Sequence, residues 1–177
     1  MNSNELTEDQ QFDLVRRDPN WIKEIDNPTE SIQYYCINHN IGLFPDIKNP
    51  TEPVCIEVAR RYPYILKYID EQFKTPNVIF EAVRNNGCVI AYVSNPSHEL
   101  MKTALDNKGA AILFFPVKNY GEDIELYALE RKWHPSVYGH ICGENKLQYK
   151  SDWFKKQLKL LKLKYGPIPE YEINNDF

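Results

Sequence analysis

Three potential zinc ligands, His134, His140 and Cys142, lie within nine residues of one another. Imidazole and thiolate groups are the ligands that Zn²⁺ prefers, and a structural zinc site needs four of them around the ion. No second pair of ligands stands nearby, and His39 and His98 lie far from this cluster. We therefore predict no metal site and interpret the three residues as part of a loop.

Side chains for nucleophilic catalysis are present, but they form no recognisable motif. A catalytic cysteine needs a histidine beside it in the fold, which sequence spacing does not reveal. The seven glycines form no Gly-x-Ser-x-Gly turn, phosphate loop or dinucleotide fingerprint. The four cysteines lack Cys-x-x-Cys spacing, so we predict free thiols that mostly fill the core. We predict no catalytic residues and no cofactor; the alternative is an enzyme that places Cys88 or Cys142 beside a histidine.

The elements that would position these residues repeat along the chain. "NPTESIQYYCINHN" begins at Asn27, and the similar "NPTEPVCIEVARRY" begins 22 residues later at Asn49. Such a fixed period is typical of repeat proteins. Aligning the chain on this period places six apolar residues, which we call the anchors, in one column. The anchors are Val15, Ile37, Ala59, Val83, Leu105 and Leu129.

Each repeat has the pattern of a helix, a break and a second short helix. Apolar residues stand at the anchor and one and five positions before it, which makes one helical stripe, and again six, seven and ten positions after it. Four positions after the anchor, Pro or Gly is expected to stop the first helix, with Gly at a positive φ. In Asn27-Pro28-Thr29-Glu30, we expect Asn to be the N-cap and Pro the first helical residue. The sixth repeat loses the three later apolar columns, as expected at the end of an array.

These patterns predict an all-α fold of tandem short helix-turn-helix repeats of about 22–24 residues, stacked as a solenoid-like array with a C-terminal capping helix. The predicted parts are a polar lead-in (1–11), one helical-repeat domain of about six units (12–149), a basic amphipathic capping helix (150–165) and an acidic flexible tail (166–177). The capping helix is expected to bury one stripe and expose a row of lysines. The stripe is Phe154, Leu158, Leu161 and Tyr165, and the lysines are Lys155, Lys159 and Lys162.

The charge is unevenly distributed along a chain with a formal net charge of −4. Residues 150–165 contain six Lys and one Asp, whereas the first 149 residues carry a net charge of −6. This acidic balance opposes binding of nucleic acid over the whole surface. There is no run of 18 apolar residues and no apolar leader. We therefore predict a cytoplasmic protein without membrane insertion.

Two rows of residues are candidate partner-binding surfaces. The column nine positions after the anchor forms an aromatic ladder, and such rings serve either as interface anchors or in packing between repeats. The ladder is Tyr68, Tyr92, Phe114 and Tyr138. The columns one and two positions after the anchor form an arginine edge, which either complements helix dipoles or binds a partner. The arginine edge is Arg16, Arg17, Arg60, Arg61 and Arg84.

The Asn-Pro-Thr-Glu motif, with Ala-Val-Arg-Asn-Asn-Gly at 82–87 and Ile-Ala-Tyr-Val at 90–93, resembles the short tandem helical repeats of uncharacterised phage and giant-virus proteins. Related repeat domains of unknown function occur in some bacterial effectors. The resemblance implies a viral protein in the host cytosol, without catalytic residues, that inhibits a host protein or defence component. We predict a non-enzymatic protein that binds a host protein. The alternative is a nucleic-acid-binding repeat protein that uses the arginine edge and the lysine-rich final helix.

Overall fold

The computed structural model describes residues 6–116, 120–143 and 145–168. Within these ranges the regular elements are α-helices and 3₁₀-helices, without any strand, which confirms the predicted all-α class. The chain divides into two compact units, Met1–Ala82 and Val83–Phe177. Most of the predicted acidic tail and residues 1–5 of the predicted lead-in lie outside the described residues. No helix in the described ranges is long and apolar enough to cross a membrane.

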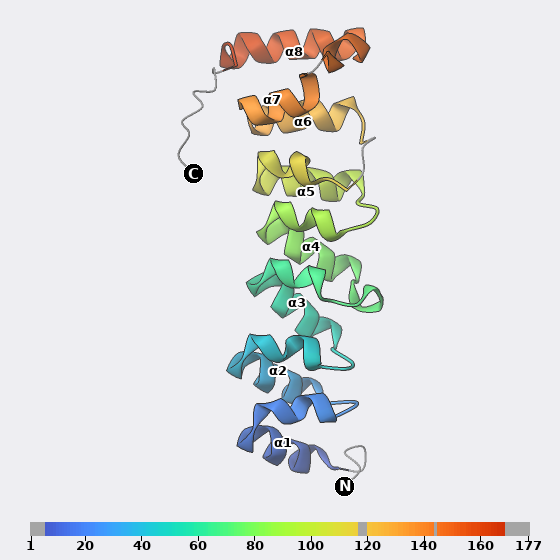
Figure 1. Ribbon diagram of the computed structural model, residues 1–177, viewed down its shortest axis with the longest axis vertical. Helices are drawn as coiled ribbons and strands as arrows, with labels where there is room; N and C mark the ends of the chain where they lie inside the picture. The colour runs from blue at the N-terminus through green and yellow to red at the C-terminus, as the bar shows by residue number, and fades with distance from the viewer. Residues whose placement is uncertain (1–5, 117–119, 144, 169–177) are drawn as a thin grey trace. The chain divides into compact units, whose positions relative to one another are not determined.

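Six α-helices of ten residues each recur at the predicted period (Figure 1). They are α1 (Glu8–Arg17), α2 (Glu30–His39), α3 (Glu52–Arg61), α4 (Pro76–Asn85), α5 (His98–Asn107) and α6 (Glu122–Arg131). All six anchors are buried, and a buried Val, Ile or Leu side chain contributes about 1.5–3 kcal/mol. Because α1 begins at Glu8, after a capping box between Thr7 and Gln10, the predicted lead-in of residues 1–11 is too long.

A 3₁₀-helix follows each of the first five α-helices after one intervening residue. These are η2 (Pro19–Glu24), η3 (Ile41–Asp46), η4 (Pro63–Lys67), η6 (Gly87–Tyr92) and η7 (Gly109–Phe114). Side chains three apart lie on one face of a 3₁₀-helix, so the positions seven and ten after the anchor point together into the core, as Ile22 and Ile25 do. The expected order of helix, break and short helix is therefore confirmed in five repeats. A further short turn, η5 (Glu71–Phe73), lies between η4 and α4.

The sixth repeat continues with an α-helix, α7 (Pro135–Cys142), in place of a 3₁₀-helix. Its buried residues Val137, Ile141 and Cys142 are four and five positions apart, which is the spacing of an α-helical face. The three later apolar columns are thus lost in the sixth repeat because its second helix is an α-helix instead of a 3₁₀-helix.

The predicted role of Asn27 and Pro28 is wrong, because Thr29 is the N-cap and α2 begins at Glu30. The Thr29 hydroxyl does not cap its own helix; it donates to the carboxylate of Glu8, the first residue of the preceding helix, at 2.6 Å. The same bond joins Thr51 to Glu30 at 3.0 Å and Thr75 to Glu52 at 2.6 Å. The recurring Thr-Glu pair therefore ties neighbouring helices together.

A buried glutamine joins the turns that precede α2 and α3. Gln33 is fully buried, and its amide donates to the carbonyl oxygens of Pro28 (2.9 Å) and Asn49 (3.1 Å). Its side-chain oxygen accepts from the backbone N–H of Thr51 at 2.9 Å. One side chain thus satisfies three backbone groups that would otherwise lack partners in the core.

The glycines four positions after the anchor do not adopt the positive φ that we predicted. Among the described glycines only Gly121 and Gly166 have a positive φ. At Gly87, an added Cβ would lie 2.2 Å from the carbonyl oxygen of Ala104 in α5. Glycine is needed there because two backbones approach closely.

The final helix, α8 (Asp152–Tyr165), follows a short turn, η8 (Lys146–Tyr149), and packs against α6. Phe154 and Leu158 are buried as predicted, but Tyr165 is 41% exposed and its ring lies 5.9 Å from that of Trp133. Lys155, Lys159 and Lys162 are exposed, which confirms their predicted orientation. The backbone N–H of the N-cap residue Ser151 donates to Glu122 at 2.9 Å, and its hydroxyl donates to the same carboxylate. Glu122, the first residue of α6, thus accepts hydrogen bonds from the N-cap residue of α8, as Glu8 of α1 accepts one from Thr29, the N-cap residue of α2.

Candidate functional site

The four members of the predicted aromatic ladder differ in exposure. Tyr68 is 62% exposed and Phe114 is 47% exposed, whereas Tyr92 and Tyr138 are half-buried. Tyr138 lies edge-on to Trp133, and the Lys162 ammonium lies 5.4 Å from its ring centre. In the second unit η6 packs against η7, so Tyr92 and Phe114 occupy equivalent positions on neighbouring helices. Tyr68 belongs to the first unit.

All five residues of the arginine edge are exposed, and several are engaged by other side chains. Arg61 contacts Glu57 at 2.7 Å and donates to Asn38 at 2.8 Å. Arg60 contacts Glu57 at 3.0 Å and Glu81 at 3.4 Å. Arg16 lies over the Phe12 ring, at 5.0 Å from its centre. Much of the charge of Arg60 and Arg61 is therefore compensated within the first unit.

Around η4 the first unit displays three exposed tyrosines, Tyr62, Tyr64 and Tyr68, which we call the tyrosine patch. Their side chains are 50%, 58% and 62% exposed. Tyr62 and Tyr68 are the two cap residues of η4, and Leu66 between them is fully buried in the core. The ammonium of Lys67 lies 5.6 Å from the centre of the Tyr68 ring. The patch is thus an aromatic surface with a cation at its edge.

One residue of the tyrosine patch, Tyr62, stands where three other repeats have a side chain that caps the 3₁₀-helix. The residue before η2, η3 and η6 is Asp18, Asn40 or Asn86, and its side chain accepts a backbone N–H two residues later at 2.9–3.1 Å. Tyr62 before η4 and Lys108 before η7 occupy the same cap position and make no such bond.

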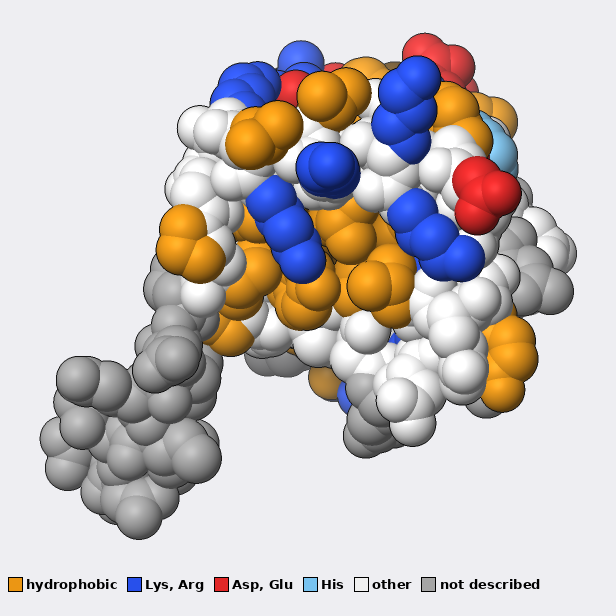
Figure 2. Space-filling view, turned by 90° about the horizontal axis from the view of Figure 1, so that it is seen from above, with side chains coloured by type: hydrophobic (Ala, Val, Ile, Leu, Met, Phe, Trp, Pro, Cys, Tyr) orange, Lys and Arg blue, Asp and Glu red, His pale blue; other side chains and the backbone are white. Residues whose placement is uncertain are grey.

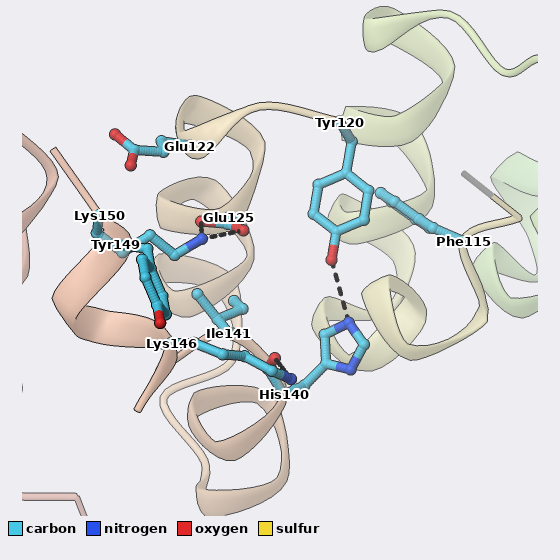
Figure 3. Close-up of a pocket in the computed structure, with 9 residues that line it drawn as sticks. All are labelled: Phe115, Tyr120, Glu122, Glu125, His140, Ile141, Lys146, Tyr149 and Lys150. Carbon is cyan, nitrogen blue, oxygen red and sulfur yellow. Dashed lines mark hydrogen bonds and ion pairs between the residues drawn. The ribbon is translucent and has the colours of Figure 1, made fainter. Parts of the chain in front are cut away.

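A second candidate site is a cavity of about 620 Å³ in the second unit. It lies among α6, α7, η8 and the segment that precedes α6 (Figure 3). The view places Phe115 and Tyr120 on one side of the cavity and Tyr149 on the opposite side. The lining residues are Phe115, Tyr120, Glu122, Glu125, His140, Ile141, Lys146, Tyr149 and Lys150. Its size and its mixture of rings and polar groups are those of small-molecule sites.

The wall of the cavity contains a largely buried ion pair between Glu125 and Lys150. The two side chains are only 14% and 16% exposed, and the ammonium contacts both carboxylate oxygens. Burial raises the pKa of Glu125, although the hydrogen bond from Lys150 opposes this effect. The pair is therefore poorly hydrated, which makes further hydrogen bonds to it favourable.

On the other side, the Tyr120 hydroxyl lies 3.1 Å from Nε2 of His140. Partial desolvation, aided by the charge of Lys146, lowers the pKa of His140 and so disfavours the charged form of its ring. Lys146 itself donates to the carbonyl oxygen of His140 at 3.0 Å. Burial, with a smaller effect of the charge of Glu125, also raises the pKa of Tyr120 to about 12.

The predicted loop cluster of His134, His140 and Cys142 is instead part of α7 and its cap. His134 accepts the backbone N–H of Ser136 at 3.2 Å and thereby caps α7. In the described ranges, no three His, Cys, Asp or Glu residues come together as a metal site would require. All four cysteines are free and buried, which confirms their predicted role in the core.

Sequence reasoning missed the cavity and its ion pair. Glu125 stands four positions before its anchor, where other repeats have Gln11, Gln33, Cys55, Ile79 and Met101. Glu125 is the one carboxylate at this position of the six repeats, and this was the sequence feature that could have indicated the ion pair. Lys150 was assigned to the capping helix, but it precedes the N-cap of α8.

The outer face of α8 was also missed. Leu163 is 75% exposed, although the outer face of a terminal helix is expected to be polar. Trp153 and Leu160 are also exposed, and they line a groove together with residues of α6. Figure 2 shows lysine side chains interleaved with hydrophobic ones on the face of the molecule that carries this helix.

Residues 53–96 are similar to a protein family that is described as a domain of unknown function, DUF4116. The matched stretch runs from α3 through η6 and includes the tyrosine patch. No curated protein and no solved structure matches the chain.

Proposed function

We propose that the chain is a non-enzymatic helical-repeat protein, with its units stacked as a solenoid-like array, that binds a protein partner through the tyrosine patch. Contacts between successive helices support the array: α1 packs against α2, α2 against α3, and α5 against α6. Repeats that each contact their sequence neighbours are the basis of solenoid stability.

The tyrosine patch carries the proposal. Tyrosine and arginine are enriched at protein interfaces, where a large ring is buried with little loss of side-chain entropy. Tyr62, Tyr64 and Tyr68 contribute three such rings within seven residues and lie exposed beside Arg60 and Arg61. Glu57 compensates the positive charge of Arg60 and Arg61, and this disfavours nucleic acid, with its phosphate backbone, as the partner.

The thiols support a role without nucleophilic catalysis. Burial raises the pKa of Cys36, Cys55 and Cys142 to about 11. A nucleophilic cysteine needs a lowered pKa, because the thiolate is the reactive form.

The partner proposed from the resemblance to phage and giant-virus repeats is a host protein or defence component, which binding would occlude.

The test is affinity capture of the tagged chain from host lysate, with and without nuclease, followed by mass spectrometry. We expect a stoichiometric protein that survives nuclease treatment. The triple variant Tyr62→Ala, Tyr64→Ala, Tyr68→Ala should lose this protein with unchanged helix content, since the three rings are exposed. Trp21→Ala, which removes another exposed ring of the first unit, is the matched control.

Retention of the partner by the triple variant would show that the tyrosine patch is not the interface. In that case Tyr92→Ala with Phe114→Ala tests the ladder in the second unit. A partner that disappears on nuclease treatment would instead support the nucleic-acid alternative.

A further inference from the structure

The cavity in the second unit is independent of the proposed protein interface and has its own chemistry. Aromatic rings stand on both sides of it: Phe115 and Tyr120, whose rings meet edge to face at 5.4 Å, and opposite them Tyr149 (Figure 3). Tyr149 is 83% exposed, so its ring is free to cover a ligand. Aromatic walls favour a planar ring between them.

The charged groups that line the cavity balance one another. Glu122 and Glu125 oppose Lys146 and Lys150, and the lowered pKa of His140 disfavours a further positive charge. An ionic ligand would leave one charge uncompensated or break the Glu125–Lys150 pair, and breaking this pair is costly because both of its side chains are largely buried. The lining therefore selects a ligand without net charge.

The ion pair offers a donor beside an acceptor. The Lys150 ammonium has three N–H groups and uses two of them on Glu125, whose carboxylate has further acceptor positions. A ligand edge with an acceptor next to a donor matches this arrangement. We infer that the cavity binds a neutral planar heteroaromatic ring with such an edge, which is the chemistry of a nucleobase.

The test is titration of the full chain with adenosine, guanosine, cytidine and uridine, followed by NMR. We expect at least one nucleoside to bind with a Kd of about 1 mM or tighter. Tyr149→Ala should weaken this binding by at least about fivefold, because stacking on one aromatic ring is lost. Tyr64→Ala, which removes an exposed ring outside the cavity, should leave the affinity unchanged.

A second variant tests the polar edge. Glu125→Gln with Lys150→Gln retains a hydrogen-bonded pair of similar size, and we expect it also to weaken binding, with far-UV circular dichroism as the check on folding. Absence of binding by all four nucleosides would overturn the inference, as would binding that persists in both variants. A nucleoside monophosphate that binds more than about tenfold tighter than its nucleoside would show an anion site and refute the selection for neutral ligands.

Discussion

Gln33 and Gln11 occupy the same position in successive repeats but differ in how well their amides are satisfied. Gln33 makes three hydrogen bonds to backbone groups of the two flanking turns. Gln11 donates to the Leu6 carbonyl oxygen at 3.2 Å, while its own side-chain oxygen is buried without a partner. The same residue type therefore stabilises one junction more than the other.

We predict that Gln33→Leu lowers the free energy of unfolding by about 2–4 kcal/mol, because it leaves three buried or partly buried backbone groups without their hydrogen bonds. Gln11→Leu should cost about 1 kcal/mol or less, since it also removes an unpaired oxygen. Urea denaturation of both variants measures the difference. Equal losses would mean that the Gln33 network does not hold the turns together.

The contact between Glu122 and Ser151 predicts a pH dependence. Burial raises the pKa of Glu122, but the hydrogen bonds from Ser151 outweigh this effect and lower the pKa below 4.5. Near and below pH 4.5 the unfolded chain therefore binds more protons at Glu122 than the folded chain does. The stabilisation from the Glu122 carboxylate is thus present at higher pH, and it is lost as the pH falls through the lowered pKa. Glu122→Gln should be less stable than the wild type by up to about 1 kcal/mol at pH 7, because the carboxylate is exposed.

The difference between Glu122→Gln and the wild type should shrink in thermal unfolding as the pH approaches about 3. A difference in stability that stays constant between neutral and acidic pH would show that the ionised Glu122 carboxylate does not stabilise the contact between α6 and α8.

At the scale of the element, the glycine that begins η6 marks a close approach of two backbones. We predict that Gly87→Ala destabilises the chain by about 1–3 kcal/mol, because its Cβ would clash with the Ala104 carbonyl oxygen. The control is Gly139→Ala within α7, where nothing lies within 4 Å of the added Cβ. That substitution should stabilise by about 0.5–1 kcal/mol. Loss of stability in both variants by the same amount, measured by chemical denaturation, would contradict the explanation from close approach.

The missing cap of η4 yields a separate prediction. Tyr62→Asn introduces the side chain that caps η3 and η6 and should stabilise the first unit by about 0.5–1 kcal/mol. It should also weaken capture of the protein partner, because one ring of the tyrosine patch is lost. Thermal unfolding measures the gain. A lower melting temperature would mean that the Tyr62 ring contributes more to folding than an Asx cap does.

At the scale of the whole molecule, contacts between sequence neighbours predict local rather than global responses. Gln33→Leu should raise hydrogen exchange in α2 and α3, the helices beside the lost bonds, and leave α5 and α6 unchanged. Mass spectrometry of the exchanged peptides measures this contrast. A uniform increase along the described residues would show that the two compact units unfold as one.

The sequence by itself determined the features that arise within a single repeat. Apolar residues one position before every anchor, and five positions before all anchors but the first, place one stripe on the ten-residue helices, so these helices follow from local periodicity. In four of the six repeats the break after the helix was likewise indicated by proline or glycine. Even there, Asn27 was mistaken for a cap because its pairing with Asn49 lies in the next repeat.

Only the tertiary structure decided what depends on residues far apart in the chain. The alignment of Thr29 with Glu8, the backbone contact at Gly87 and the pairing of Glu125 with Lys150 each join residues 17 to 25 positions apart. Periodicity assigns a residue to a face of its own helix but does not identify the group on the neighbouring helix that meets it. In the wall of the cavity, Glu125 pairs with Lys150, which follows the last repeat. Tertiary packing brings these two residues together.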